Sequence, residues 1–447
     1  MQLPVLASGL SVPARLQHQA RRRGQAVTAS NNGAKLQPDV SERVKATDAP
    51  CIVKTKQLMA GVEGVLSLAQ GVVSWGPPQA ALDRAAAALA NSGISAYGPC
   101  EGLPELRAAL GQKIQDENGL HGYNVMVTAG ANQAFTNVLL TLMDASDRIV
   151  LFTPYYFNHL MAVQMTGGAH NVVYGECDKQ TWHPDLDWLE RELAGPSPPK
   201  VVVIVNPCNP TGVLLSRAEL ERASELCRAA GCWLVMDDTY EHFVYEGREH
   251  VCLSGEHILH IFSFSKAFGM MGWRMGYIAY PDFDGRGELG AELNKIQDTI
   301  PICPTQISMH VALGAVDAGR TWVDSRLDTV VANKDVLIDA LSPLGALGHG
   351  VAGGEGAIYL WAKLPDGCED DEAVVEWLVQ QHRVCLIQGT SCGCPGYIRV
   401  AFANLDPDTC REAATRLKQG LTQLVAKGLP GTQQVREHVK ADEVLYS

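Results

Sequence analysis

From about residue 125, short apolar runs rich in β-branched residues alternate with longer segments whose apolar residues recur at helical spacing. The short runs predict strands over residues 125–127, 148–152, 201–205, 233–236 and 258–264. The longer segments predict helices over 132–143 and 217–230. This alternation is typical of a mostly parallel sheet that is covered by helices on both faces and binds ligands at the carboxyl ends of its strands.

The pattern changes after about residue 320. A helical pattern over 324–341 precedes a glycine-rich turn at 353–356 and strand patterns at 358–362, 384–387 and 397–402. We therefore predict an α/β fold with a large domain over 76–320, built on a mostly parallel sheet, and a smaller C-terminal α/β domain over 321–430. Segment 41–75 has no core of its own and is expected to pack on the small domain. Segments 1–40 and 431–447 are expected to be loose ends.

The composition limits the possible functions. Of 447 residues, 46% are hydrophobic and 19% are charged, as in ordinary soluble globular proteins. The formal net charge of -13 disfavours a nucleic-acid partner, because phosphate binding requires a basic surface. No apolar stretch is long enough to span a membrane. Small-molecule substrates fit this composition better.

The N-terminal segment carries a targeting pattern. No acidic residue precedes Asp39, whereas Arg15, Arg21 and Arg23 stand among serine, alanine and glutamine residues. This pattern predicts an organelle transit peptide, and hence a plastid or mitochondrial location. A basic tail on a cytoplasmic enzyme is the alternative.

Thirteen cysteines are scattered along the chain, most of them in apolar segments. Cys392 and Cys394 are close in a glycine-rich loop, where they could form a redox or metal pair. The spacing of a metal knuckle and a second pair of ligands are both missing. We expect reduced thiols and no metal.

The string Ser263-Phe264-Ser265-Lys266 follows an apolar strand, and Arg274 comes eight residues later in a glycine-bordered turn. A lysine at a strand end can form a Schiff base with an aldehyde if burial or nearby positive charge lowers its pKa. An arginine offers a planar fork of donors to a phosphate. Ser-x-x-Lys alone more often marks a surface lysine, so the prediction depends on the whole string.

Two further strands end in polar residues. Asp237 ends one of them, with Tyr240 three residues later, and Asn209 lies in a proline-rich turn after the other. A carboxylate at such a position can keep the ring nitrogen of pyridoxal phosphate protonated, which makes the ring an electron sink. The alternatives are a helix-capping aspartate and an ordinary turn-forming asparagine.

A phosphate site is predicted where residues 130–132 join a strand to a helix. Backbone N–H groups of Ala131 and Asn132, after Gly130, would point at an anion. Tyr156 follows the next strand, where its ring can stack on a planar cofactor or pack in the core.

Arg399 lies inside an otherwise apolar strand, where an unpaired charge would be costly. It therefore needs an anionic partner. The carboxylate of a substrate, held by two parallel hydrogen bonds, and a structural salt bridge are the two interpretations.

In this order and at these spacings, the motifs resemble those of the class I, fold-type I aminotransferases over roughly residues 66–424. The resemblance implies transfer of an amino group between an L-amino acid and a 2-oxo acid, with pyridoxal 5'-phosphate as cofactor. It also implies a homodimer with shared active sites. Lys266, Asp237 and Tyr240 would be the catalytic residues.

The same resemblance implies binding roles. Asn209 and Tyr240 would contact the phenolic oxygen of the cofactor, and Tyr156 would stack on its ring. The cofactor's phosphate would be held by Gly130, Ala131, Asn132, Ser263, Ser265 and Arg274, together with Tyr97 of the neighbouring subunit. The substrate would be bound by Arg399, Gly71, Asn209 and Trp75. Because Ala131 stands where many relatives have a hydroxyl residue, the phosphate would depend more on backbone groups, Ser263 and Arg274.

Longer strings at 68–73, 127–135 and 353–362 are similar to those of plant aromatic aminotransferases that use methionine and indole-3-pyruvate. Residues 301–306, where aspartate-specific relatives place a second arginine, contain no cation. A dicarboxylate side chain would remain unpaired there, whereas an aromatic or methionine side chain would meet Ile302, Trp75 and Phe402. The alternatives are an aspartate-preferring transaminase and a lyase on the same fold, such as an aminocyclopropane-carboxylate synthase or a C–S lyase.

Overall fold

The computed structural model describes residues 38–430. The chain divides into two compact units, residues 1–41 and 42–447, and every helix and strand named below belongs to the second. The predicted transit peptide, except for residues 38–40, and the predicted tail at 431–447 lie outside the described residues.

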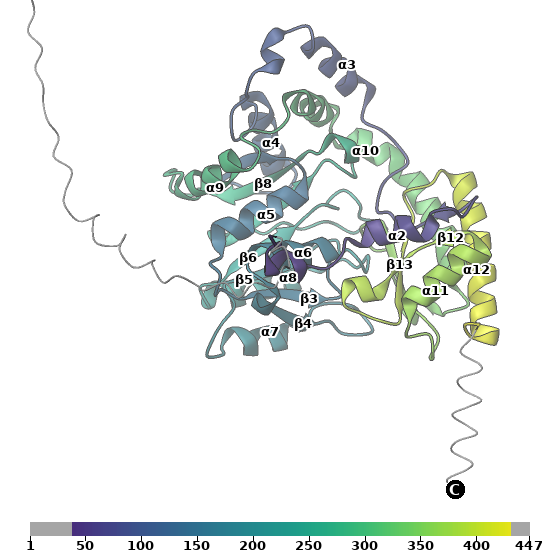
Figure 1. The fold of residues 1–447 in the computed structure, drawn as a ribbon. Coiled ribbons are helices and arrows are strands. Elements are labelled where there is room, and N and C mark those ends of the chain that lie inside the picture. The colour runs from purple at the N-terminus through teal and green to yellow at the C-terminus, as the bar shows by residue number, and fades with distance from the viewer. Residues whose placement is uncertain (1–37, 431–447) are drawn as a thin grey trace, which may run out of the picture. The chain divides into compact units, whose positions relative to one another are not determined.

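The large sheet has seven strands in the order β2-β8-β7-β6-β5-β3-β4 (Figure 1). Its strands are β2 (Tyr123–Thr128), β3 (Ile149–Thr153), β4 (Val172–Glu176), β5 (Val201–Val205), β6 (Trp233–Asp237), β7 (Ile258–Ser263) and β8 (Gly276–Pro281). All neighbouring strands are parallel except for β8, which is antiparallel to both β2 and β7. The predicted α/β class with a mostly parallel large sheet is confirmed. The pattern missed two of its strands, β4 and β8.

The central strands of this sheet are buried on both faces, which explains why β5 and β6 are almost continuously apolar. Val201 and Val203 belong to one core with α5 (Ala131–Leu142), α6 (Phe157–Thr166) and α9 (Glu288–Thr299). Val202 and Ile204 point the other way, into a second core with α4 (Pro104–Asp116), α7 (Leu186–Leu193) and α8 (Arg217–Ala229). Successive strand residues thus serve opposite faces, as the two-residue period of a strand requires.

The smaller sheet has five strands in the order β13-β14-β11-β10-β9. They are β9 (Ala346–Leu347), β10 (Gly350–Gly353), β11 (Tyr359–Lys363), β13 (Ile387–Gln388) and β14 (Tyr397–Ala401). Helices α11 (Asp371–Trp377) and α12 (Pro407–Lys427) follow in this part of the chain. The long helical element α10 (Gln306–Leu341) leads into it and is interrupted at Gly319, where the backbone is not helical.

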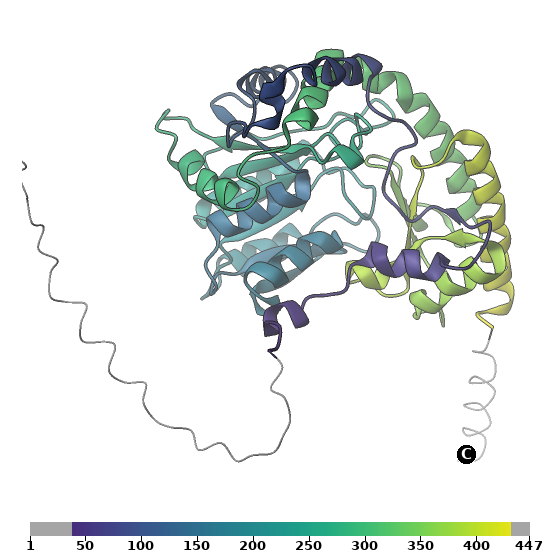
Figure 2. The same cartoon turned by 45° about the horizontal axis from the view of Figure 1, so that its top comes forward.

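The N-terminal segment first contacts α6 of the large sheet, where the backbone N–H of Asp48 donates to Oε1 of Gln164 at 3.0 Å, and then the smaller sheet region. It contains α1 (Glu42–Lys45), α2 (Cys51–Met59) and β1 (Leu66–Ser67), and α3 (Gln79–Ala88) follows. Strand β1 pairs in parallel with β12 (Val384–Cys385). Nζ of Lys54 in α2 lies 3.7 Å from Oε1 of Glu372 in α11, and the two helices lie side by side in Figure 2. Residues 66–75 therefore run along the smaller sheet, and the chain then continues to the helices and strands of the large sheet.

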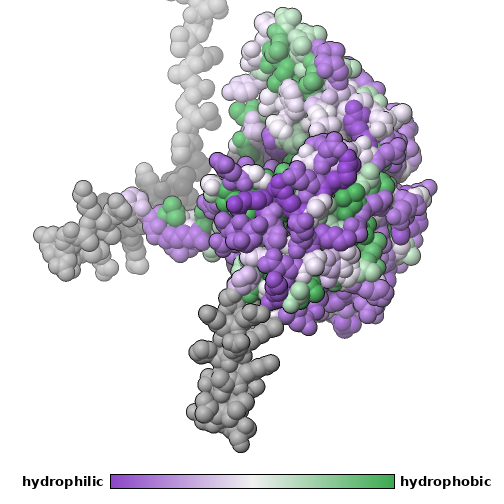
Figure 3. All heavy atoms as spheres, turned by 90° about the vertical axis from the view of Figure 1, so that its right-hand side faces the viewer, coloured by the Kyte–Doolittle hydropathy of each residue, from purple (hydrophilic) through white to green (hydrophobic). Residues whose placement is uncertain are grey.

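The face that carries the C-terminal helices is covered mainly by polar side chains, with apolar ones in small groups (Figure 3). Among the described helices, none combines the length and the apolar character that crossing a membrane requires.

Candidate active site

A cavity of about 260 Å³ lies where the carboxyl ends of the central strands of the large sheet meet the smaller sheet. Strand β5 leads to Asn209, β6 ends at Asp237, and β7 leads to Lys266, and all three side chains line the cavity. Nine other predicted site residues line it as well: Gly71, Ala131, Asn132, Tyr156, Tyr240, Ser263, Ser265, Arg274 and Arg399. Parallel strands bring their carboxyl ends to one edge, which is why segments far apart in sequence converge here.

Lys266 lies in the loop after β7, and its Nζ donates a hydrogen bond to the carbonyl oxygen of Gly71. Burial lowers the pKa of Lys266 to about 8, and the positive charges of Arg399 and Arg274 act in the same direction. A larger fraction of this amine is therefore neutral near physiological pH than of an ordinary lysine. A neutral amine is the form that attacks a carbonyl group.

One end of the cavity forms a cradle for an anion. The backbone of Gly130 has a φ of 86° and opens α5, and a Cβ at this position would lie 2.4 Å from Nη2 of Arg274. Arg274 itself has a φ of 52° and donates from Nη1 to the carbonyl oxygen of Met271, 2.8 Å away. Within residues 38–430, no carboxylate pairs with Arg274. A helix N-terminus, an unpaired guanidinium and the hydroxyls of Ser263 and Ser265 together fit a phosphate.

Asp237 is 5% exposed and is held in a fixed orientation. Its Oδ2 lies 3.0 Å from Nε2 of His159, and its Oδ1 accepts a hydrogen bond from the backbone N–H of Thr239 at 3.0 Å. His159 comes from α6 and packs against Phe135, with ring centroids 4.1 Å apart. The sequence interpretation missed His159; its only sequence signal was a histidine three residues after Tyr156.

Arg399 is 1% exposed and lies on β14. Its Nη1 donates to Oδ1 of Asn209 and its Nη2 to the carbonyl oxygen of Ala69, both at 2.8 Å. Its Nε is buried without a hydrogen-bond partner. Within residues 38–430, no carboxylate pairs with this guanidinium, so the structural salt bridge considered from the sequence is not found there. A buried cation that has only neutral partners fits a substrate carboxylate.

A tyrosine pair closes the cavity beside Arg399. The hydroxyl oxygens of Tyr240 and Tyr359 are 2.5 Å apart, and both side chains are buried. Tyr359 is the first residue of β11 and also lines the cavity. The sequence interpretation missed Tyr359, because an aromatic residue at the start of an apolar strand is ordinarily a core residue.

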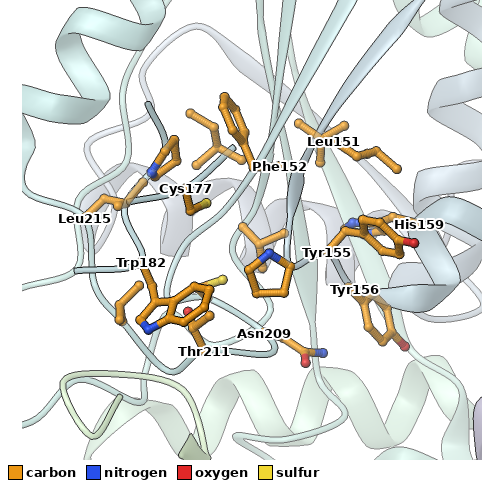
Figure 4. Close-up of a pocket in the computed structure, with 17 residues that line it drawn as sticks. Leu151, Phe152, Tyr155, Tyr156, His159, Cys177, Trp182, Asn209, Thr211 and Leu215 are labelled. Carbon is orange, nitrogen blue, oxygen red and sulfur yellow. The ribbon is translucent and has the colours of Figure 1, made fainter. Parts of the chain in front are cut away.

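Tyr156 opens α6, and its hydroxyl accepts a hydrogen bond from Nδ2 of Asn158 at 2.9 Å. A second cavity of about 40 Å³ is shown in Figure 4, where Tyr156 and Asn209 lie in the lower part of the view. The two cavities share Tyr156, His159 and Asn209. Aliphatic and aromatic side chains such as Leu151 and Trp182 form most of the second cavity's wall.

Three residues that the sequence linked to the site lie elsewhere. Trp75 does not line the cavity, because its Nε1 donates to the carbonyl oxygen of Ala267 at 3.2 Å and its ring stacks on Phe243. Phe402 is fully buried next to Tyr245 and cannot meet a substrate side chain. Tyr97 is 80% exposed, outside the cavity of its own chain.

The cysteine pair considered from the sequence, Cys392 and Cys394, consists of two buried free thiols. Burial raises the pKa of both thiols, so both are protonated at neutral pH.

Comparison with known proteins agrees with this geometry. Residues 63–417 match the family model described as aminotransferase class I and II. The chain belongs to the class I and II aminotransferases. It is 50% identical over 392 residues to the aromatic aminotransferase ISS1 of Arabidopsis thaliana, covering 87% of this chain and 98% of that protein.

Solved aminotransferase structures share the fold. An aspartate aminotransferase from Thermus thermophilus with maleate superimposes with a TM-score of 0.76 at 28% identity, covering 86% of this chain and 100% of that one. An aromatic aminotransferase from Pyrococcus horikoshii gives a TM-score of 0.73 at 26% identity, covering 83% and 99%. The aminotransferase therefore exchanges an amino group between an amino acid and a 2-oxo acid, and its buried guanidinium lies where a carboxylate common to both can be held.

Replacing Arg399 with lysine tests this carboxylate site. We expect Arg399→Lys to lower kcat/KM by about 10–1000-fold, mainly through KM, because each charge-assisted hydrogen bond that is lost contributes about 1.5–3 kcal/mol. Steady-state kinetics with a fixed 2-oxo acid measures the change. The control is Arg286→Lys, whose side chain is 68% exposed, and which should leave the kinetics unchanged. A wild-type KM in Arg399→Lys would show that this guanidinium does not bind the carboxylate.

Proposed function

We propose that this aminotransferase uses pyridoxal 5'-phosphate, bound in the cavity with its phosphate in the cradle of Gly130 and Arg274. The observation that carries the proposal is that three cations, Lys266, Arg274 and Arg399, line one cavity without a carboxylate partner in the described part of the chain. A phosphate and a substrate carboxylate would compensate this positive charge. Membership of the aminotransferase family also supports this cofactor.

When bound, pyridoxal phosphate supplies an electron-accepting ring that stabilises negative charge on the α-carbon of the substrate. The carboxylate of Asp237, held by His159 at 3.0 Å, is the group that retains a proton on the ring nitrogen. Asn209 and Tyr240 offer an amide and a hydroxyl to the phenolic oxygen, and the ring of Tyr156 provides a stacking surface. Lys266, which lines the same cavity, would hold the aldehyde carbon of the cofactor and would move the proton on the substrate's α-carbon as general base and acid.

The lowered pKa of Lys266 predicts how cofactor capture depends on pH. Only the neutral amine reacts with an aldehyde, and the neutral fraction rises with pH through the pKa. We expect the rate at which cofactor-free enzyme captures pyridoxal phosphate to rise to half its maximum near pH 8, instead of near the ordinary lysine value of 10.5. Stopped-flow absorbance of the bound cofactor measures this rate. Lys266→Ala is the control without a reactive amine, and a midpoint near 10.5 would contradict the prediction.

We propose an aromatic amino acid or methionine as the preferred amino donor. Ile52 from α2, Val72 and Phe157 contribute apolar side chains to the lining of the cavity. The three cations of the cavity are committed to the cofactor and to the α-carboxylate, so the described residues offer no further cation to a side-chain carboxylate. Burying an unpaired carboxylate is costly, whereas an apolar side chain gains from burial. The likeness to the Arabidopsis aromatic aminotransferase supports the same choice.

Absorbance of the purified holoenzyme tests this preference. Adding tryptophan or methionine without a 2-oxo acid should convert the cofactor band to that of the amine form, and aspartate at equal concentration should not. Continued turnover should require a 2-oxo acid, because the amino group needs an acceptor. Conversion by aspartate alone would contradict the apolar-donor proposal. Release of product without any 2-oxo acid would instead indicate a lyase.

We also propose a homodimer. Leu89, Tyr97, Ile300 and Ile302 are large apolar or aromatic side chains that are 63%, 80%, 52% and 40% exposed. The segments that carry Tyr97 and Ile302 lie together, since the backbone N–H of Gly98 donates to Sγ of Cys303 at 3.3 Å. A second copy would cover this patch and bring Tyr97 to the cofactor phosphate of its partner.

Light scattering coupled to size-exclusion chromatography should give a mass twice the chain mass of 48.2 kDa. We expect Leu89→Glu with Ile300→Glu to produce monomers, since two charges would be buried at the interface. Leu347→Glu changes a leucine that is 46% exposed on β9 and serves as the matched control, which should remain dimeric. A wild-type protein of single-chain mass would refute the dimer.

A further inference from the structure

Tyr359 contacts two of the groups that the proposed function uses, Tyr240 and Arg399, although it is not one of them. Its hydroxyl oxygen lies 2.5 Å from that of Tyr240, and the two rings meet edge to face with centroids 5.5 Å apart. Each hydroxyl has a single proton to donate. If Tyr359 donates to Tyr240, then the proton of Tyr240 is available to a third partner in the cavity. If Tyr240 donates to Tyr359, that proton is consumed within the pair.

The ring of Tyr359 has a second contact. The Cζ atom of Arg399 lies 4.3 Å from the ring centroid, so the guanidinium rests on the aromatic face. Tyr359 and Arg399 come from neighbouring antiparallel strands, β11 and β14. The pairing of β11 with β14 therefore holds the ring of Tyr359 against the guanidinium of Arg399.

Two neighbouring glycines leave room for Tyr359, one beside its hydroxyl and one beside its backbone. A Cβ on Gly71 would lie 1.8 Å from the Tyr359 hydroxyl oxygen. A Cβ on Gly212, which ends the turn carrying Asn209, would lie 2.1 Å from the carbonyl oxygen of Tyr359. Both segments approach Tyr359 more closely than any side chain would permit. The position of Tyr359 is thus defined by both segments that border the substrate site.

We propose that Tyr359 is a positioning residue, which donates its hydroxyl proton to Tyr240 and thereby directs the Tyr240 proton toward the phenolic oxygen of the cofactor. The proposal rests on the proposed function, since it requires pyridoxal phosphate in this cavity. A hydroxyl that accepts one hydrogen bond becomes a stronger donor in the next. Tyr359 therefore strengthens the contact by which Tyr240 stabilises negative charge on the phenolic oxygen. The ring of Tyr359 serves Arg399 independently of the hydroxyl.

The charged and titratable groups around the pair set the background for a pH measurement. Burial raises the pKa of both Tyr240 and Tyr359, so both hydroxyls remain protonated through the neutral range, while Arg399 opposes this rise. The groups that face the pair are Tyr156, Asp237, Cys392 and Arg399, and Lys266 lines the same cavity. Removing the Tyr359 hydroxyl leaves all of these charges in place.

The test is a pH titration of the cofactor absorbance in the holoenzyme without substrate. Tyr240 stabilises the deprotonated, negatively charged form of the chromophore, so a weaker Tyr240 contact should raise its spectroscopic pKa. We expect Tyr359→Phe to raise this pKa by about 0.2–0.7 pH unit. The KM for the amino acid should change less than about twofold, because the phenylalanine ring still supports Arg399.

Tyr245→Phe is the matched control. Tyr245 is also buried, and its hydroxyl donates to the carbonyl oxygen of Ala357 at 2.7 Å, so this change removes an equivalent hydrogen bond away from the pair. It should not move the spectroscopic pKa. In a Tyr240→Phe background, Tyr359→Phe should have no further effect on that pKa, because the intermediate hydroxyl is gone.

The results distinguish a failure of the Tyr359 role from a failure of the proposed cofactor. A wild-type protein without a cofactor band would refute the proposed function itself. A normal band with an unchanged pKa in Tyr359→Phe would overturn only the role of Tyr359. So would a shift that Tyr245→Phe reproduces, or one that persists undiminished in the Tyr240→Phe background.

Discussion

The buried guanidinium of Arg399 is the feature on which the architecture of the site depends. A charge that is 1% exposed must be surrounded by hydrogen-bond acceptors. Those acceptors come from the N-terminal segment through Ala69 and from the large-sheet turn through Asn209, while Arg399 itself lies on β14. Three segments that are far apart in sequence must therefore converge. Their convergence encloses the cavity and leaves the guanidinium without a carboxylate of its own in the described chain.

The same enclosure activates Lys266. Removing the amine from water and placing it near two guanidinium groups disfavours its charged form, which lowers the pKa to about 8. The cations that prepare the lysine are also those that would hold the phosphate and the carboxylate. A bound anion would compensate these positive charges. The pKa of Lys266 and the binding of anions are therefore coupled. This coupling explains why a site without internal carboxylate partners suits a reaction between an amine and a carbonyl group.

The residues proposed to bind the ligands are held in turn by residues that have no proposed part in the reaction. His159 fixes the carboxylate of Asp237, and Tyr359 fixes the hydroxyl of Tyr240. Gly71 and Gly130 contribute by lacking a side chain, since a Cβ at either position would overlap Tyr359 or Arg274. These contacts keep the polar groups in place within the cavity.

The sequence by itself determined the elements and motifs whose physical basis is local. Apolar runs with turn signals identified β5, β6 and β7 to within a residue or two, and the polar residues at their ends identified Asn209, Asp237 and Lys266 as neighbours, because parallel strands share one carboxyl edge. An arginine within an apolar strand identified Arg399 by the cost of burying it. Other features depend on contacts between distant segments, which no local pattern contains. The tertiary structure alone decided that β8 runs antiparallel, that Trp75 packs on Phe243 instead of lining the cavity, and that His159 and Tyr359 meet Asp237 and Tyr240. Aromatic residues and histidines serve equally well in a core or at a site, so only their neighbours in space assign them to one or the other.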